Sequence, residues 1–269
     1  MAAENSSAPD LVKSLHGKCA IVTGGGRGIG RAVALEFARL GVCVHIVSRS
    51  DNAIQVAQDI VATGGRAHGH VGSVANESFA RSVIEEIVSR DGQVDILVNA
   101  AAIIGPWGRF SEGSMSAFID VLNVNLVGAC NFIRWTLGGM ERAGFGRIIN
   151  FAGGGAAYSY PMFSPYGASK AALVRMTEII GDEIQAPNVT INIIAPGAVD
   201  TDMLAEIRRY GGEVRTLVDI SEPVRLVTFL AGPDSAHING RFIHSRDDWR
   251  DIGLFDTPDL LKLRRTEKR

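Results

Sequence analysis

A tyrosine and a lysine in this sequence have a spacing that suits proton transfer. Tyr166 and Lys170 are four positions apart in the stretch SPYGASK, and on a helix that spacing places both side chains on one face. A free phenol has a pKa of about 10, and a neighbouring ammonium group lowers that pKa because it stabilises the phenolate. The pair therefore predicts a general acid and base, with Tyr166 carrying the proton and Lys170 tuning its pKa.

A glycine-rich stretch further upstream could bind phosphate. The apolar run that ends at Thr23 continues into GGGRGIG, residues 24–30, and then into the helical pattern RAVALEFARLG. Glycines let the backbone approach a pyrophosphate closely, and the N-terminus of the following helix adds unpaired N–H groups and a partial positive charge. Because a strand precedes the turn and a helix follows it, the stretch predicts a dinucleotide site.

The elements that must position these groups follow an alternating pattern. Short runs rich in β-branched residues alternate with longer helical patterns, which is typical of βαβ units around a parallel sheet. Strands are expected at residues 19–23, 42–47, 67–71, 94–98, 147–151, 190–194 and 241–244. Helices are expected to begin near Arg27, Asp51, Asn76, Ser114, Ser164 and Glu222. We therefore predict an α/β fold, a single doubly wound domain with a parallel, seven-stranded sheet.

The chain is expected to divide into three segments. Residues 1–14 are predicted to be a disordered N-terminal arm, residues 15–244 the α/β domain and residues 245–269 a C-terminal extension. No internal repeat or Pro/Gly/Ser linker separates a second core. The extension is charged but carries Trp249 and Phe255, so it is either a solvated tail or a segment that docks through its aromatic residues, on this subunit or a neighbour.

Composition restricts the partners and the compartment. A net charge of −2 and a pI near 6.3 provide no basic field for a nucleic acid, so the expected partner is a small molecule. Cys19, Cys43 and Cys130 form no C-x-x-C pair, which favours a reduced, cytoplasmic location. The first ten residues lack the features of a signal peptide, and we expect no apolar run long enough to span a membrane.

Taken together, the motifs resemble those of the short-chain dehydrogenase/reductase family. The likeness covers roughly residues 15–244 and rests on TGGGRGIG at 23–30, DILVNAAA at 95–102, the Tyr-x-x-x-Lys pair and a Pro-Gly turn at 196–197. It implies a Rossmann fold with a bound nicotinamide dinucleotide. It also implies an enzyme that interconverts a secondary alcohol and a ketone, with Tyr166 as proton donor or acceptor.

The resemblance also implies which residues contact the cofactor. These are Thr23, Gly24, Gly26, Arg27, Gly28, Ile29, Gly30, Ser48, Arg49, Asn99, Ala100, Ala101, Tyr166, Lys170, Pro196, Gly197, Val199 and Thr201. Ser48 stands where NAD-preferring members carry an acidic residue, and Arg49 could pair with a 2′-phosphate. NADP(H) is therefore favoured, and NAD(H) remains the alternative. Gly72 replaces the family's usual adenine-contacting Asp.

One expected group is missing from the chemical centre. Asn125 matches the family asparagine that maintains a water-linked proton path to the lysine. The family's catalytic serine lies thirteen residues before the tyrosine, where this chain has Gly153. Loss of one such donor lowers rates by about 10²- to 10³-fold in other enzymes.

Three interpretations of this loss remain open. Ser159, Ser164 or the backbone N–H groups of Gly153 to Gly155 could replace the hydroxyl. A substrate hydroxyl or a water could fill the gap, which suits a polar, sugar-like substrate. Alternatively, the chain binds dinucleotide with little catalysis. A dehydratase or epimerase that uses the cofactor transiently is a further rival.

Three remaining expectations concern assembly, metal and the substrate opening. In the resembling family the helices that start near Ser114 and Ser164 form the subunit interface, which implies a homodimer or homotetramer. The histidines show no carboxylate–His cluster at ligand spacing, so we expect no metal site. Residues 202–220 occupy the position of a substrate lid, and Tyr158, Tyr160, Met162 and Phe163 are expected to border the opening.

Overall fold

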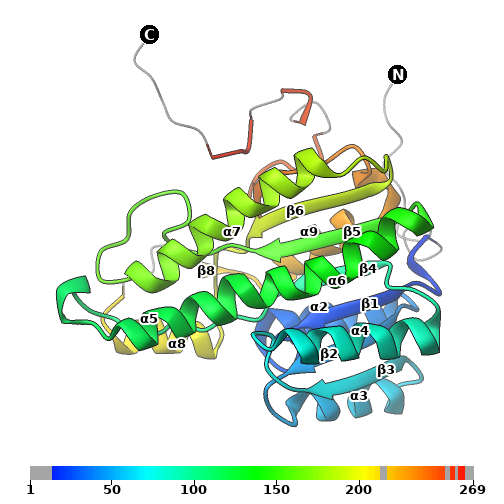
Figure 1. The fold of residues 1–269 in the computed structure, drawn as a ribbon, viewed down its shortest axis with the longest axis horizontal. Helices are drawn as coiled ribbons and strands as arrows, with labels where there is room; N and C mark the ends of the chain where they lie inside the picture. Colours follow the sequence, from blue (N-terminus) through cyan, green and yellow to red (C-terminus); the bar gives the residue numbers. More distant parts are fainter. Residues whose placement is uncertain (1–13, 213–216, 252–254, 258–259, 264–269) are drawn as a thin grey trace.

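The computed structural model describes residues 14–212, 217–251, 255–257 and 260–263 (Figure 1). Its centre is a seven-stranded parallel sheet in the order β3-β2-β1-β4-β5-β6-β9. The strands are β1 Cys19–Thr23, β2 Cys43–Ser48, β3 Arg66–Val71, β4 Ile96–Asn99, β5 Gly146–Phe151, β6 Val189–Ala195 and β9 Phe242–His244. The predicted fold class and the number of strands are therefore confirmed.

Helices cover both faces of the sheet, as expected for a doubly wound fold (Figure 1). One face is packed by α2 Gly28–Arg39, α3 Asn52–Ala62 and α9 Ser221–Ala231. The other is packed by α4 Glu77–Asp91, α6 Gly128–Ala143 and α7 Ser164–Glu183. The chain from α5 Met115–Leu122 reaches α6 without a break, through a π-helical turn at Asn123–Val127.

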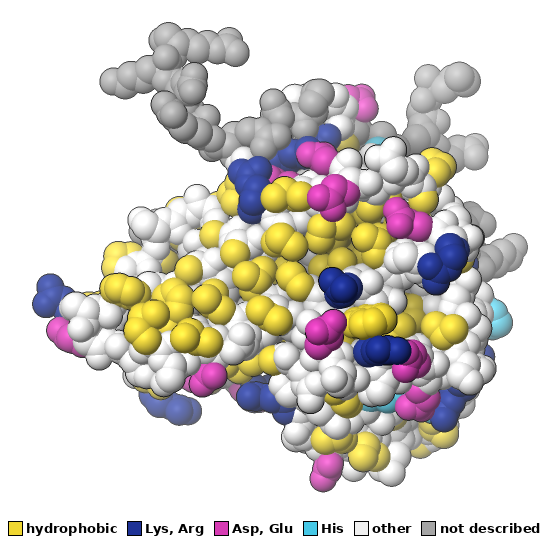
Figure 2. Space-filling model, viewed as in Figure 1, with side chains coloured by type: hydrophobic (Ala, Val, Ile, Leu, Met, Phe, Trp, Pro, Cys, Tyr) yellow, Lys and Arg dark blue, Asp and Glu magenta, His cyan; other side chains and the backbone are white. Residues whose placement is uncertain are grey.

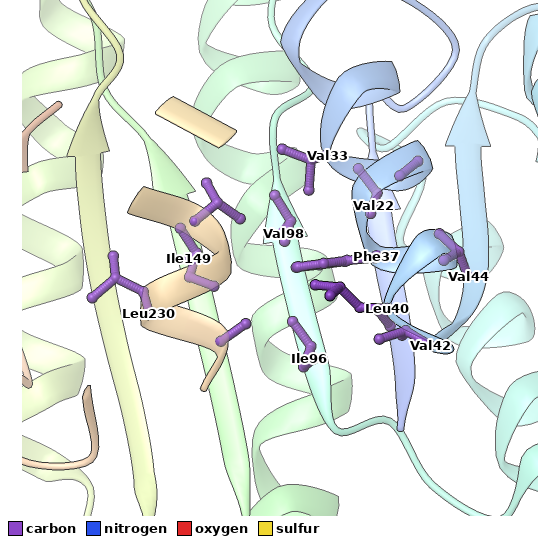
Figure 3. Close-up of a cluster of buried hydrophobic side chains, with 14 of the residues drawn as sticks. Val22, Val33, Phe37, Leu40, Val42, Val44, Ile96, Val98, Ile149 and Leu230 are labelled. Atoms are coloured by element: carbon purple, nitrogen blue, oxygen red, sulfur yellow. The ribbon is translucent and has the colours of Figure 1, made fainter. Parts of the chain in front are cut away.

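The sequence pattern of β1 explains how one strand serves two cores. Successive side chains of a strand point to opposite faces, and here Val22 lies in the cluster with Phe37 of α2, whereas Ile21 lies in the cluster beneath α4 and α6. Figure 3 shows Phe37 pointing from α2 toward Val98 of β4, with Leu230 of α9 in the same layer. Each such buried side chain contributes about 1.5–3 kcal/mol of transfer free energy.

The aromatic residues of the C-terminal extension pack onto this same chain. Trp249 and Phe255 are only 4% and 6% exposed and belong to the α2–α9 core cluster. The Trp249 ring lies 5.0 Å, centroid to centroid, from Phe229 of α9. Docking through the aromatic residues is thus the alternative that the structure adopts. Apart from Ser14, the predicted N-terminal arm lies outside the described residues.

The segment expected to be a substrate lid contains elements that the sequence pattern did not indicate. α8 spans Asp202–Arg209, and β7 Ala198–Val199 pairs in parallel with β8 Leu217–Val218 to form a second, two-stranded sheet. Strands of two residues are too short to show a hydrophobic period. Residues 213–216 of this segment lie outside the described residues.

The expectation about apolar length needs one correction. The continuous helix Met115–Ala143 is long and apolar enough to cross a membrane by length and composition alone. One side of it packs into the protein, because Phe132 and Met140 are at most 1% exposed in the cluster beneath β4 and β5. The sequence expectation was wrong because it considered separate apolar runs and not this one uninterrupted helix.

Candidate active site

The predicted site residues meet at the carboxyl ends of the central strands. β1 ends at Thr23, β4 at Asn99, β5 at Phe151 and β6 at Ala195, and these four strands are neighbours in the sheet. After β1 the chain continues to β2 and β3 on one side of β1, and it then crosses to β4 on the other side. The loops after β1 and β4 therefore diverge at this point. In open α/β sheets that divergence forms the crevice in which ligands bind.

The glycine turn after β1 is too tightly folded to accept side chains. Gly24 and Gly28 have φ values of +67° and +54°, a left-handed conformation that favours glycine. A Cβ on Gly30 would lie 2.4 Å from the Gly24 carbonyl oxygen. α2 begins at Gly28, and its N-cap residue Arg27 makes no side-chain cap bond. The first N–H groups of α2 are thus available to an anion, and the turn fits a pyrophosphate.

The residues expected to select the dinucleotide lie beside this turn. A Cβ on Gly26 would lie 3.1 Å from Ser48 Oγ, which places the end of β2 against the glycines. Arg49 is exposed and has no ion-pair partner within the described part of the chain. Arg27 lies 3.4 Å from Asp202 of α8, measured from Nη1 to Oδ2. Arg49 is therefore the cation that remains available at the end of β2.

Packing explains why the usual aspartate is missing at position 72. A Cβ on Gly72 would lie 2.5 Å from the ring of Phe79, a residue of α4. Real Cβ atoms do not approach other atoms so closely, so a side chain at 72 would require the Phe79 ring to move. Phe79 occupies the space that an adenine-contacting aspartate would need.

The turn after β4 is held against β1 by backbone and side-chain hydrogen bonds. The N–H of Ala100 donates to the Thr23 carbonyl oxygen at 3.2 Å, and that of Ala101 to Thr23 Oγ1 at 3.3 Å. Asn99 donates from Nδ2 to Asn150 Oδ1 at 2.9 Å. Its own Oδ1 is buried and has no partner among the described residues. That oxygen is a polar group still able to accept a hydrogen bond from a ligand.

Tyr166 and Lys170 come together near the start of α7. They are 5% and 1% exposed, and Lys170 Nζ lies 5.6 Å from the centroid of the Tyr166 ring. The Lys170 ammonium donates to the carbonyl oxygen of Phe151, the last residue of β5, at 2.7 Å. Both side chains therefore lie on one face of α7, as the helical spacing predicted, and that face is directed at the carboxyl end of the sheet.

The direction of their pKa shifts differs from the sequence expectation. Burial raises the pKa of the Tyr166 phenol, and burial lowers the pKa of Lys170 to about 7. The expectation of a lowered phenol pKa was wrong for this state, because both groups are desolvated and the lysine directs a hydrogen bond at a backbone carbonyl. The phenol consequently keeps its proton at neutral pH.

Asn125 lies in the π-helical turn and connects three parts of the site. Its Oδ1 accepts from the Ile103 N–H at 2.8 Å, and its Nδ2 donates to the Ile103 carbonyl at 2.9 Å and to Ser169 Oγ at 3.0 Å. Ser169 in turn donates to the Tyr166 carbonyl at 2.7 Å. Asn125 thus fixes the loop after β4 to α7. The water-linked path to Lys170 stays a prediction.

The position of the missing serine is occupied by the phenol. A Cβ on Gly153 would lie 2.3 Å from Tyr166 Oη and 2.9 Å from its Cζ. Glycine therefore lets the Tyr166 hydroxyl lie directly against the loop backbone. While the phenol stays there, it fills the position of a Cβ on Gly153, so a water or a substrate hydroxyl cannot occupy that position. Ser159 is exposed in the same loop, and its role as a substitute stays a prediction.

Aromatic side chains form one wall of the opening. Phe163 stacks on Tyr166 at 4.5 Å, Trp107 lies 4.9 Å from Phe163, and Tyr210 stacks parallel to Trp107 at 6.4 Å, all between ring centroids. A cavity of about 280 Å³ adjoins this wall, and its lining includes Trp107, Arg109, Glu112, Phe118 and Ser164. Trp107 was not identified from the sequence, where its only signal is an apolar residue in the loop after β4.

The turn after β6 closes the crevice. Gly197 has a φ of +75°, and a Cβ there would lie 2.4 Å from Val218 of β8. Thr201 caps α8, since its Oγ1 accepts from the Leu204 N–H at 3.4 Å and donates to the Val199 carbonyl at 3.2 Å. The Pro196 carbonyl accepts from Ser245 Oγ at 3.0 Å. Contact of Thr201 with a cofactor carboxamide stays a prediction.

Comparison with known proteins identifies the family. The family model described as short chain dehydrogenase matches residues 18–210. The chain belongs to the short-chain dehydrogenase family. Membership makes it an NAD(P)-dependent oxidoreductase, and the unpaired N-terminus of α2 beside the glycine turn fits the dinucleotide that the family uses.

Similar proteins include enzymes with different substrates. The short-chain dehydrogenase is 33% identical to the 3-oxoacyl-acyl-carrier-protein reductase FabG of Pseudomonas aeruginosa, over 84% of this chain and 95% of that protein. It is 31% identical to an NADPH-dependent aldehyde reductase-like chloroplastic protein of Arabidopsis thaliana, over 85% and 93%. A crystal structure of a putative gluconate 5-dehydrogenase from Beutenbergia cavernae with bound NADP has 32% identity and a TM-score of 0.80, with 86% and 96% covered.

The histidines on β2 of this short-chain dehydrogenase and on the neighbouring β3 do have a carboxylate close by. His45 Nε2 lies 2.9 Å from Asp91 Oδ2, and His45 Nδ1 lies 2.9 Å from His70 Nε2. The premise that no carboxylate accompanies the histidines was wrong, because the last turn of α4 returns Asp91 to the start of β2. The expectation of no metal site rested on that premise.

Proposed function

We propose that this chain is an NADP(H)-dependent oxidoreductase that interconverts a secondary alcohol and a ketone on a small polar metabolite, sugar-like compounds included. The observation that carries the proposal is the common burial of Tyr166 and Lys170 at the mouth of the parallel strands. A bound nicotinamide cofactor would supply or accept the hydride. Tyr166 Oη would give the substrate oxygen its proton in reduction and take it back in oxidation.

The protonation states of the two groups fit a proton relay. Burial raises the pKa of the Tyr166 phenol, so the phenol holds its proton at neutral pH and can give it up once a bound substrate oxygen becomes the stronger base. Lys170, with a pKa of about 7, exchanges a proton readily in the same range and can return one to the phenolate after the substrate has taken the first. Asn125 keeps α7 in place through Ser169 during this exchange.

The preference for NADP(H) over NAD(H) is supported by charge at the end of β2. Ser48 places no carboxylate there, and the exposed Arg49 offers a guanidinium able to pair bidentately with a 2′-phosphate. NADP or NADPH also appears in the names of two proteins that are similar to this chain.

The mixed lining of the cavity beside the aromatic wall supports the substrate class. Arg109, Glu112 and Ser164 combine charged and hydroxyl groups with the aromatic wall of Trp107, a mixture that suits a small hydroxylated compound. Two similar solved structures are named for gluconate 5-dehydrogenase and xylitol dehydrogenase.

An exposed apolar face supports a homodimer or homotetramer. Figure 2 shows apolar side chains gathered over α5, α6 and α7, where Met115, Ile119 and Ile179 are 56%, 50% and 45% exposed. A second copy of the chain would remove this face from water. The free cysteines at 19, 43 and 130 support a cytoplasmic location.

Tyr166→Phe provides the decisive test. We expect NADPH oxidation with a panel of ketones to fall by about 10²-fold or more, while NADPH still raises the melting temperature of the variant. Unchanged turnover in Tyr166→Phe would refute the proposed role of the phenol. If the wild-type protein turns over no substrate yet binds NADPH, it is a dinucleotide-binding protein. Product formation without net cofactor consumption would indicate the dehydratase or epimerase type.

A further inference from the structure

At the end of the sheet opposite the cofactor crevice, four side chains with metal-binding atoms lie together. Cys43 and His45 belong to β2, His68 belongs to β3, and Asp91 is the last residue of α4. One ligand atom from each of them lies within 4.8 Å of all the others. β2 and β3 pair His45 with His68 in register, so both rings stand on one face of the sheet.

The distances are compatible with a tetrahedral ion. His45 Nε2 and Asp91 Oδ2 are 2.9 Å apart, and Cys43 Sγ and Asp91 Oδ1 are 3.8 Å apart. In a tetrahedral zinc site with ordinary bond lengths, such atoms are about 3.3–3.6 Å apart. These two separations fall on either side of that range. The widest pair must close by about 1 Å, and neither His68 nor Asp91 is fully buried.

We propose that these four side chains bind one zinc-class divalent cation that joins β2, β3 and α4. A thiolate with two imidazoles selects zinc-like ions over magnesium or calcium, which prefer all-oxygen sites. The thiolate and the carboxylate together balance the charge of the ion, and the Cys43 thiol releases its proton on binding. Four protein ligands leave no open position, so the ion would be structural.

A second observation supports this assignment, because the neighbours of His45 are those of a metal ligand. A ligating histidine usually donates its other ring N–H to a fixed acceptor. His45 Nδ1 lies 2.9 Å from His70 Nε2, and His70 Nδ1 lies 3.8 Å from Glu86 Oε2. When His45 Nδ1 donates to His70 Nε2 and His70 Nδ1 donates toward Glu86, Nε2 of His45 carries a lone pair. That lone pair faces Asp91.

One cation competes with the proposed ion. Arg90 Nη1 lies 2.8 Å from His68 Nδ1, and this contact needs a lone pair on Nδ1. Binding of metal through Nδ1 would use that lone pair, and binding through Nε2 would place a proton on Nδ1. In both cases Arg90 must leave His68, and Glu86, 3.3 Å from its Nη2, is an alternative partner.

The proposed ion is separate from the redox site. Cys43 begins β2 and Ser48 ends it, and five strand steps of about 3.3 Å separate the two ends by about 16 Å. A cavity of about 490 Å³ with Cys43 and Asp91 in its lining gives the ion a path from solvent. We therefore expect metal to change stability and not the identity of the substrate.

Cobalt titration of the reduced, chelator-treated full chain tests the site. We expect one Co²⁺ per chain, with the visible bands of tetrahedral cobalt and a near-ultraviolet thiolate-to-cobalt band that Zn²⁺ abolishes by displacement. Cys43→Ser should remove the thiolate band, and Cys130→Ser, on α6, should keep it. A wild-type chain that shows neither band with excess cobalt overturns the proposal. A thiolate band that survives Cys43→Ser, or is lost in Cys19→Ser alone, also overturns it.

Arg90→Gln gives a check that does not depend on removing a ligand. Loss of the competing guanidinium should tighten Zn²⁺ binding by about tenfold or more, since a hydrogen bond to a charged group no longer has to be broken on binding. Competition against a chromophoric chelator measures this change. Unchanged or weaker Zn²⁺ binding in Arg90→Gln would exclude His68 as a ligand and refute the proposed set. Arg81→Gln, an exposed arginine on the same helix paired with Glu85, is the matched control.

Discussion

Replacing Gly153 by alanine separates two explanations of the missing hydroxyl. If the only effect of glycine at this position is the loss of a hydrogen-bond donor, one added methyl group should be tolerated. The structure predicts otherwise, because a Cβ at 153 would lie 2.3 Å from Tyr166 Oη. Alanine adds this atom and no hydrogen-bonding group, so its effect reports the space alone.

The expected magnitude follows from the overlap. Ordinary contacts of a Cβ begin at 3.4 Å, so the phenol must retreat by about 1 Å. Its ring cannot retreat freely, because it is stacked on Phe163 at 4.5 Å. Overpacking of this kind destabilises a protein by about 1–3 kcal/mol. A displacement of about 1 Å at a reacting group lowers turnover by about 10²-fold.

Urea denaturation and steady-state NADPH oxidation measure the two effects. Gly154→Ala is the matched control, because a Cβ on Gly154 meets no atom within 4 Å. We expect that control to change the free energy of unfolding by no more than about 0.5 kcal/mol and to leave turnover unchanged. The difference between the two variants then isolates the contact with Tyr166.

Two results would refute the reasoning. Gly153→Ala with the stability and turnover of the Gly154→Ala control would mean that the phenol does not occupy this space. Gly153→Ser with turnover raised by about 10²-fold would mean that the site lacks a donor and that the phenol moves aside at little cost.

Three further predictions concern charge and packing. The pKa of Lys170 is about 7 in the folded chain against an ordinary 10.5, so between these values the unfolded chain holds more protons. The stability of the wild type relative to Lys170→Met should therefore rise with pH, by at most about 1.4 kcal/mol per pH unit. Urea denaturation of both proteins from pH 7 to 9 checks this, and a stability difference that does not change with pH contradicts it. Arg49→Ala should weaken NADPH binding by about tenfold or more and NADH binding much less, as measured by fluorescence titration; equal losses would remove the NADP preference. Trp249→Ala should destabilise the chain by about 3–5 kcal/mol in urea denaturation, and a loss below about 1 kcal/mol would show that the extension contributes little to the core.

The sequence predicted the sheet well because parallel strands that are buried on both faces have continuous apolar sequences. Runs such as CAIVT and ILVN lie in β1 and β4 of the structure. The glycine turn was also predictable, because a strand, a glycine-rich turn and a helix follow one another directly in the sequence. The short pairing of β7 with β8 carried no such pattern.

What the sequence could not supply was the relation between distant side chains. Trp107 packs against Phe163, and Asp91 lies beside His45, only because loops and helices return to the sheet. The opposite pKa shifts of Tyr166 and Lys170 depend on burial, which spacing on a helix does not report. The reason for a glycine at position 153 is its contact with the Tyr166 phenol, which only the folded structure reveals.

The π-helical turn at Asn123–Val127 holds one residue more than an α-helical turn. Losing that residue would convert the turn to regular α-helix and change which side chain of the segment faces the loop after β4. Asn125 would then leave the Ile103 backbone that it contacts with both ends of its amide. We therefore expect related chains to keep the length of this turn and its asparagine, and to vary the exposed Val127.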